Sequence, residues 1–134
     1  MGYKDGEHYE PSYGSEKMKF WRYSEILETI PAWLWQRGAT HIDLYVRILS
    51  QLHECNYRLI LNLVRNINTD LLLYILRLTT DREFKGGDLT SDLEHRRTPG
   101  GVFIRELKMN LDTNGIMRRN EIDEIFLRTD TVYS

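Results

Sequence analysis

Residues 68–78 read Asn68-Thr69-Asp70-Leu71-Leu72-Leu73-Tyr74-Ile75-Leu76-Arg77-Leu78. Asn68 or Thr69 can cap the N-terminus of a helix, because a side-chain oxygen at that position accepts a hydrogen bond from a free backbone N–H. The apolar residues that follow would lie on nearly every face of such a helix. A helix of this kind must be covered by neighbouring elements, so the segment predicts the central helix of an all-α domain.

Two segments upstream carry the same helical periodicity. The first begins at Thr40, a candidate N-cap, and its apolar positions are Ile42, Tyr45, Val46, Leu49 and Leu52. The second begins at Asn56, also a candidate N-cap, and its apolar positions are Ile60, Leu63, Val64 and Ile67. Only a few residues separate these helices from one another, which favours antiparallel neighbours in a compact bundle.

Weaker helical segments lie on both sides of this bundle. A short helix is expected over residues 24–29, and Pro31 either ends it or starts the next turn. Thr98 followed by Pro99 is typical of a helix start, and Asn120 is a candidate cap for a last helix. We therefore expect a compact bundle of five to six helices, with a long glycine-containing basic loop at residues 80–98 before the fifth helix. The predicted core is Ile42, Val46, Leu49, Ile60, Leu63, Val64, Leu72, Ile75, Leu76, Phe103 and Leu107.

The 134 residues correspond to about one domain. We expect four parts: a flexible N-terminal arm at 1–19, an aromatic segment at 20–39, a helical domain at 40–110 and a C-terminal helical extension at 111–134. No apolar run approaches the ~18 residues of a membrane span, so no membrane contact is expected. The single cysteine, Cys55, is consistent with a reducing compartment, the nucleus or the cytosol.

Basic residues gather around the predicted loop although the formal net charge of the chain is −2. They are accompanied by two glycine pairs, which permit close approach of a ligand to the backbone, and by the Thr98 helix start, whose free N–H groups favour a phosphate. Arginine grips phosphate oxygens and stacks on bases. The alternative is a loop closed by ion pairs with its own acidic residues, which the residues alone favour. The basic residues are Arg77, Arg82, Lys85, Arg96, Arg97, Arg105 and Lys108, and the glycines are Gly86, Gly87, Gly100 and Gly101.

A sequence motif changes that balance. The run Arg96-Arg97-Thr98-Pro99-Gly100-Gly101-Val102-Phe103, preceded by Gly86-Gly87 and followed by Leu107-Lys108, resembles the RNA-binding domain of the phosphorylated adaptor for RNA export family. The helices from about Leu44 to Thr79 resemble that domain more weakly. The resemblance covers about residues 40–110 and implies a helical domain that binds single-stranded RNA with little sequence preference.

The resemblance also implies a site and partners. The expected RNA-binding residues are the seven basic residues, the four glycines and Thr98, with Arg96, Arg97 and Lys108 supplying most phosphate contacts and Phe103 acting as a core anchor. Members of the family bridge small nuclear RNAs, a cap-binding complex and an export receptor, so cap-binding or export proteins are candidate partners, and shuttling between nucleus and cytoplasm is expected. The chain is expected to be too short for the adaptor's other segments, which favours an adaptor or a small ribonucleoprotein subunit.

Three other interpretations remain open. The chain could be a structural subunit of a large assembly that acts mainly through protein contacts. Residues 110–121 fit a calcium-loop pattern, but Asn110 replaces the usual first aspartate and Arg118 and Arg119 add positive charge, so a glycine-containing turn between two helices is preferred. The tryptophans Trp21, Trp33 and Trp35 could stack on bases, although packing of the N-terminal segment onto the core, or contact with a partner protein, is preferred. No catalytic or metal-ligand arrangement can be argued from the sequence, so neither an enzyme nor a cofactor is expected.

Overall fold

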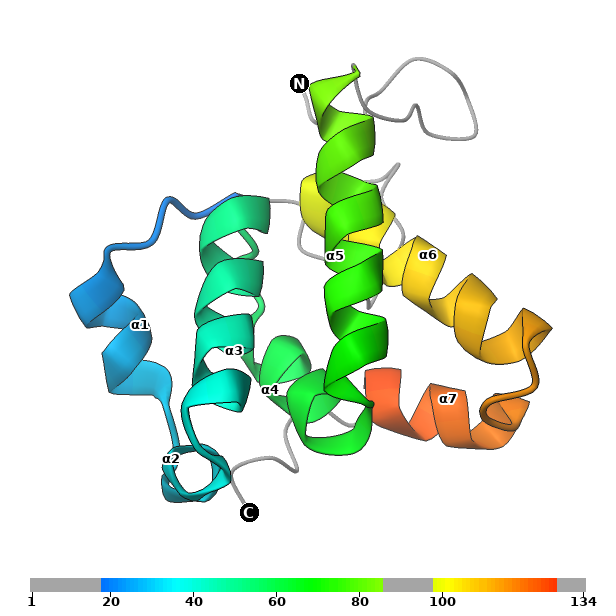
Figure 1. The fold of residues 1–134 in the computed structure, drawn as a ribbon, viewed down its shortest axis with the longest axis horizontal. Helices are drawn as coiled ribbons and strands as arrows, with labels where there is room; N and C mark the ends of the chain where they lie inside the picture. Colours follow the sequence, from blue (N-terminus) through cyan, green and yellow to red (C-terminus); the bar gives the residue numbers. More distant parts are fainter. Residues whose placement is uncertain (1–17, 86–97, 128–134) are drawn as a thin grey trace.

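The computed structural model describes residues 18–85 and 98–127, and within them the chain forms seven α-helices and no strand (Figure 1). This confirms the predicted all-α class, with more helices than the five or six expected. The extra helix is α2, which starts after Pro31 in the N-cap position, whereas the first helix already ends at Thr29 with Ile30 as its C-cap. The helices are α1 (Tyr23–Thr29), α2 (Ala32–Arg37), α3 (Ala39–Leu52), α4 (Tyr57–Asn66), α5 (Thr69–Phe84), α6 (Pro99–Thr113) and α7 (Arg119–Leu127).

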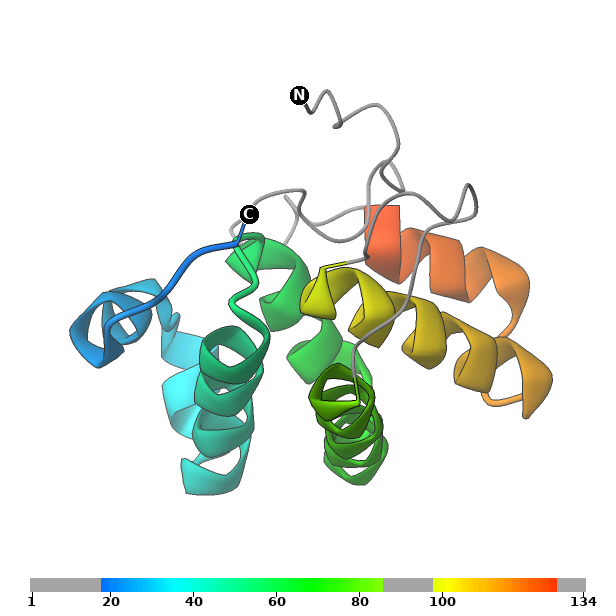
Figure 2. The same cartoon turned by 90° about the horizontal axis from the view of Figure 1, so that it is seen from above.

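Helices α3 and α5 lie side by side at the centre of the molecule, and the chain runs from bottom to top in both of them in the view of Figure 1. Helices α1 and α2 cover one side of α3, while α6 packs against α5 on the other side of the molecule. Helix α7 packs against α4 and α6, and Figure 2 shows it beside α6 at the edge of the molecule. The apolar segment at 68–78 therefore lies in a central helix, as its pattern predicts.

A single hydrophobic cluster runs through all seven helices. Nine of the eleven predicted core residues are buried, while Ile42 and Val46 are only partly buried. These two lie beside the buried stripe of α3, which is centred on Tyr45, Ile48 and Leu49. Among the described residues, no helix is both long enough and apolar enough to cross a bilayer.

Of the five helix caps predicted from the sequence, three are confirmed and two are wrong. The side chains of Asn56, Asn68 and Thr98 accept backbone hydrogen bonds at the starts of α4, α5 and α6. Thr40 is not a cap, because α3 already begins at Ala39. The residue before it, Gly38, has a φ of 102°, which glycine adopts far more readily than other residues.

The last helix also starts earlier than predicted. Asn120 lies inside α7, which begins at Arg119. The carboxylate of Glu121 accepts a hydrogen bond from the backbone N–H of Arg118 at 2.9 Å, so Glu121 takes the role expected of Asn120.

The predicted loop at residues 80–98 is wrong over its first five positions, because α5 continues to Phe84. Local contacts extend the helix: the Thr80 hydroxyl donates to the Arg77 carbonyl at 3.0 Å, and Lys85 pairs with Asp81 at 3.2 Å. The positions from Gly86 to Arg97 lie outside the described residues.

Two of the three tryptophans pack the N-terminal helices onto the core. The Trp21 indole N–H donates to the Glu54 carbonyl at 2.8 Å, and Trp33 packs against the core with Arg37 and Arg65 over its ring. Trp35 is exposed. Of the two roles preferred for the tryptophans, packing onto the core therefore holds for Trp21 and Trp33. Contact with a partner protein stays a prediction for Trp35, which is exposed on α2.

Candidate nucleic-acid interface

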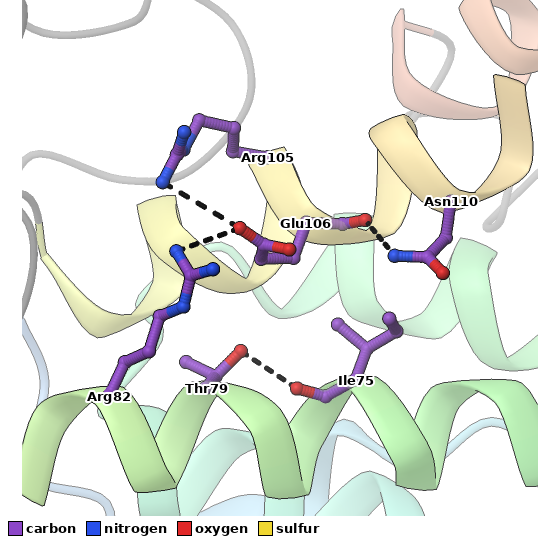
Figure 3. Close-up of polar contacts among 6 residues, drawn as sticks. All are labelled: Ile75, Thr79, Arg82, Arg105, Glu106 and Asn110. Atoms are coloured by element: carbon purple, nitrogen blue, oxygen red, sulfur yellow. Dashed lines mark hydrogen bonds and ion pairs between the residues drawn. The ribbon is translucent and has the colours of Figure 1, made fainter. Parts of the chain in front are cut away.

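Two arginines from different helices converge on one carboxylate where α5 crosses α6 (Figure 3). Arg82 of α5 approaches the Glu106 carboxylate at 2.9 Å, and Arg105 of α6 approaches the same oxygen at 3.7 Å. The Glu106 side chain is only 9% exposed, whereas each arginine side chain is 37% exposed. Two guanidinium groups thus approach one buried carboxylate, and both arginine side chains are partly exposed to solvent.

The neighbouring polar side chains bond to their own helices. The buried Thr79 hydroxyl donates to the Ile75 carbonyl at 2.8 Å, and the Asn110 amide donates to the Glu106 carbonyl at 2.9 Å (Figure 3). These contacts satisfy buried polar groups without reaching across to the other helix. The charged link between α5 and α6 therefore rests on Arg82 and Glu106.

The spacing between Phe103 and Glu106 in the sequence indicates that Glu106 is buried. Glu106 follows Phe103 by three residues, and this spacing places both on the same face of a helix. Phe103 was predicted to be buried, so a carboxylate on its face should require a cationic partner. Arg82, the partner, lies 24 positions earlier in the chain, and no local pattern connects the two.

The first turn of α6 is capped and packed by protein groups. The Thr98 hydroxyl accepts a hydrogen bond from the Gly101 N–H at 3.1 Å, and Pro99 occupies the first turn. Gly100 is buried, and a side chain there would overlap a carboxylate oxygen of Glu54, which is itself buried. The absence of a side chain at Gly100 thus allows the Glu54 carboxylate to pack closely against the first turn of α6. The sequence did not predict this contact because Glu54 belongs to the distant α3–α4 connection.

The other predicted site residues are spread over several faces. Lys85 follows the end of α5 and pairs with Asp81. Arg77 lines a hollow between α3 and α5 together with Asp43 and Arg47. Lys108 lies over the Phe126 ring, with its ammonium 5.7 Å from the ring centroid, between α6 and α7. Gly86, Gly87, Arg96 and Arg97 lie outside the described residues.

The structure thus brings Arg82 and Arg105 together, on helices that lead into and out of residues 86–97. It places Thr98, Gly100 and Gly101 in the first turn of α6, on the helix that carries Arg105. Arg77 and Lys108 face other helices, α3 and α7. The candidate interface defined by described residues is therefore the surface at Arg82 and Arg105, together with the adjoining α6 start.

The segment that resembles a calcium loop is the turn between α6 and α7. Residues 110–113 continue α6, so they do not form the extended loop that the pattern requires. Asp112 pairs with Arg119 at 3.2 Å, and Gly115 has a φ of 66° in the turn that follows. The preferred interpretation, a glycine-containing turn between two helices, is confirmed.

Replacing Gly100 with alanine should destabilise the domain by about 1–3 kcal/mol, the usual cost of overpacking. The added methyl group would overlap the Glu54 carboxylate, which is buried and holds the Asn56 N–H at 2.7 Å. Gly101→Ala is the matched control, because its methyl group would meet only the Thr98 hydroxyl at 3.2 Å. Chemical denaturation of both variants measures the difference, and equal stability of the two would contradict the packing role of Gly100.

Comparisons with known proteins identify the family of the segment that contains this surface. A family model described as the RNA-binding domain of the phosphorylated adapter RNA export protein matches residues 44–131. The match begins in α3 and includes both arginines, the α6 start and all of α7, so it extends beyond residue 110. Searches of curated proteins and of solved structures give no match.

Proposed function

The chain belongs to the family of the RNA-binding domain of the phosphorylated adapter RNA export protein, and on this basis we propose that it binds single-stranded RNA with little sequence preference. The observation that carries the proposal is the pair Arg82 and Arg105, oriented by the buried Glu106 and partly open to solvent. Guanidinium groups held in this way can contact two oxygens of an RNA backbone. Arg96 and Arg97 directly precede the α6 start and add two further positive charges.

Contacts to phosphate explain the expected lack of sequence preference. Phosphate groups carry no base identity, so a protein that mainly contacts them reads the backbone and not the sequence. With a net charge of −2, the affinity from phosphate contacts should be modest, and it should fall as the salt concentration rises. Single-stranded RNA fits better than a duplex because its bases are free to contact the protein as well.

The family also supports a place for the chain in RNA export. We infer that it acts as an adaptor or as a small subunit of a ribonucleoprotein, moving between nucleus and cytoplasm, with cap-binding or export proteins as partners. The proposal includes no catalysis and no cofactor.

Replacing Arg96 and Arg97 together with alanine should weaken binding of a single-stranded oligoribonucleotide by about tenfold or more. The dependence of log affinity on log salt should become shallower by about 0.7 for each lost phosphate contact. Fluorescence anisotropy at several salt concentrations, with circular dichroism to check the fold, measures both effects.

The chain supplies a matched control in Arg118 and Arg119, a second adjacent arginine pair. They lie at the α6–α7 turn, at the end of α6 remote from its start (Figure 1). The double alanine variant of this pair removes the same charge, so it should change affinity and salt slope much less. Equal losses in the two double variants would refute a localised site. No RNA binding by the wild-type protein at low salt would refute the proposed function itself.

A further inference from the structure

An exposed aromatic ring packs at a tilt against a histidine beside the α6 start. Phe20 is 71% exposed, and its ring lies 4.2 Å from the His53 ring, centroid to centroid, at an interplanar angle of 41°. One face of the phenylalanine is supported by the imidazole while most of the side chain stays in solvent. Most of the Phe20 side chain is therefore open to a further contact.

The backbone holds this ring pair in place. The Lys19 N–H donates to the His53 carbonyl at 2.9 Å, and Met18 forms a β-bridge with Glu54. His53 itself has a φ of 54°, and it is the one non-glycine residue of the described ranges, 18–85 and 98–127, with a positive φ. His53 is the C-cap of α3, and the left-handed conformation is a common way for a helix to end.

Two aromatic residues near this ring pair in the chain, Trp21 and Tyr57, are partly buried against the core, and each has a cation close to its ring. The Trp21 ring meets the Tyr57 ring edge to face, with centroids 6.0 Å apart. The Lys19 ammonium lies 4.7 Å from the Trp21 ring centroid, and the Arg58 guanidinium lies 6.0 Å from the Tyr57 ring centroid. Alternation of aromatic rings with cations is the pattern by which proteins hold single-stranded nucleic acids, because rings stack on bases and cations contact phosphates.

One acidic group modifies the charge of this surface. The Arg22 N–H donates to the Glu25 carboxylate, and this hydrogen bond lowers the pKa of Glu25. The ionised carboxylate forms an exposed pair with Lys19 at 3.8 Å. Lys19 therefore contributes less to phosphate binding than its charge alone implies, and the contribution of Phe20 should come mainly from stacking.

The ring pair adjoins the candidate RNA interface through a single residue. Glu54 follows His53 in the chain, and its carboxylate packs against Gly100 in the first turn of α6. Residues 18–22 precede the 44–131 segment that matches the family, so this surface joins the family's domain to a segment outside the match. A strand of RNA leaving the α6 start could thus meet Phe20 directly.

We propose that Phe20, supported by His53, is a stacking platform for a base of single-stranded RNA, extending the binding surface beyond the α6 start. This inference rests on the proposed function, and it assigns the N-terminal segment to base contacts and the arginines to phosphate contacts. The two classes of contact respond differently to salt, because stacking releases no counterions.

The test uses the full chain and a fluorescein-labelled oligouridylate. Phe20→Ala should weaken binding by about tenfold, the scale of one lost base stack, and should leave the salt slope unchanged. Phe20→Trp keeps an aromatic face and should bind like the wild type. Trp35→Ala removes another exposed aromatic residue, 51% exposed on α2, and should have no effect. Thermal unfolding followed by circular dichroism should give wild-type midpoints for Phe20→Ala and Phe20→Trp.

The outcomes separate the two proposals. Unchanged affinity of Phe20→Ala, or an equal loss in Trp35→Ala, would overturn the stacking platform while the proposed function stands. A shallower salt slope in Phe20→Ala would also overturn it, because the loss would then be electrostatic. If the wild-type protein binds no oligouridylate at low salt, both proposals fall, and a protein partner becomes the better explanation of the exposed ring.

Discussion

The Phe103→Ala variant should be less stable than the wild type by about 3–5 kcal/mol. Phe103 lies in the first half of α6, is completely buried and belongs to the single hydrophobic cluster of the domain. Truncation removes the ring and leaves a cavity that the surrounding helices can fill only in part. Because a small domain is stable by about 5–15 kcal/mol, this loss removes a large fraction of its stability.

Urea denaturation monitored by circular dichroism measures the change, and Phe84→Ala is the matched control. Phe84 ends α5 and is 90% exposed, so its truncation should change stability by less than about 0.5 kcal/mol. The two variants test whether Phe103, which belongs to the motif that resembles the RNA-export family, is a buried anchor of α6 or a surface contact. A Phe103→Ala variant as stable as Phe84→Ala would show that this ring serves a surface role instead of anchoring α6.

Measuring RNA binding by Phe103→Ala distinguishes a role of this ring in the fold from a direct contact with RNA. Under conditions where Phe103→Ala is still folded, its affinity for RNA should change little, because the buried ring cannot touch the ligand. Loss of affinity in the folded variant would mean that the orientation of α6 is disturbed and that Arg105 depends on it.

The sequence predicted helices where local rules act alone. Asn56, Asn68 and Thr98 cap their helices as expected, because a cap depends on residues within one turn. The periodicity of α4, α5 and α6 identified most of the core for the same reason. The start of α3 was misplaced because a side-chain cap at Thr40 was assumed where the backbone of Gly38 determines the boundary.

The candidate site was predicted less completely because it depends on contacts between distant residues. Arg82 and Arg105 were identified by their charge, but the carboxylate that joins them was not. Gly100 was interpreted as an approach for phosphate, yet it packs against Glu54, 46 positions earlier in the chain. Phe20 and His53 meet only after the N-terminal segment bonds to the α3–α4 connection. No spacing within one helix encodes such pairs.

The role of the last helix was also open from sequence, where residues 111–134 read as an extension of the domain. In the structure α7 packs against α4 and α6, and the Asn62 amide of α4 donates to the Ile125 carbonyl of α7. Phe126 is completely buried, and the Lys108 ammonium of α6 lies over its ring. These contacts tie α7 to two helices of the segment that carries the candidate interface.

Replacing Phe126 with alanine should therefore destabilise the whole domain by about 3–5 kcal/mol, and not only fray its last helix. If α7 belongs to one cooperative unit, unfolding of the variant will remain a single transition at a lower urea concentration, with coincident curves from different probes. Ile116→Ala is the control, because Ile116 lies just before α7 and is 52% exposed. A wild-type midpoint for Phe126→Ala, or an early separate transition that leaves the rest of the domain at wild-type stability, would show that α7 is an independent appendage. A single transition would also mean that the Phe126 ring of the wild type, over which the Lys108 ammonium lies, is ordered together with the rest of the domain. Any contribution of Lys108 to RNA binding would then depend on the folding of α7.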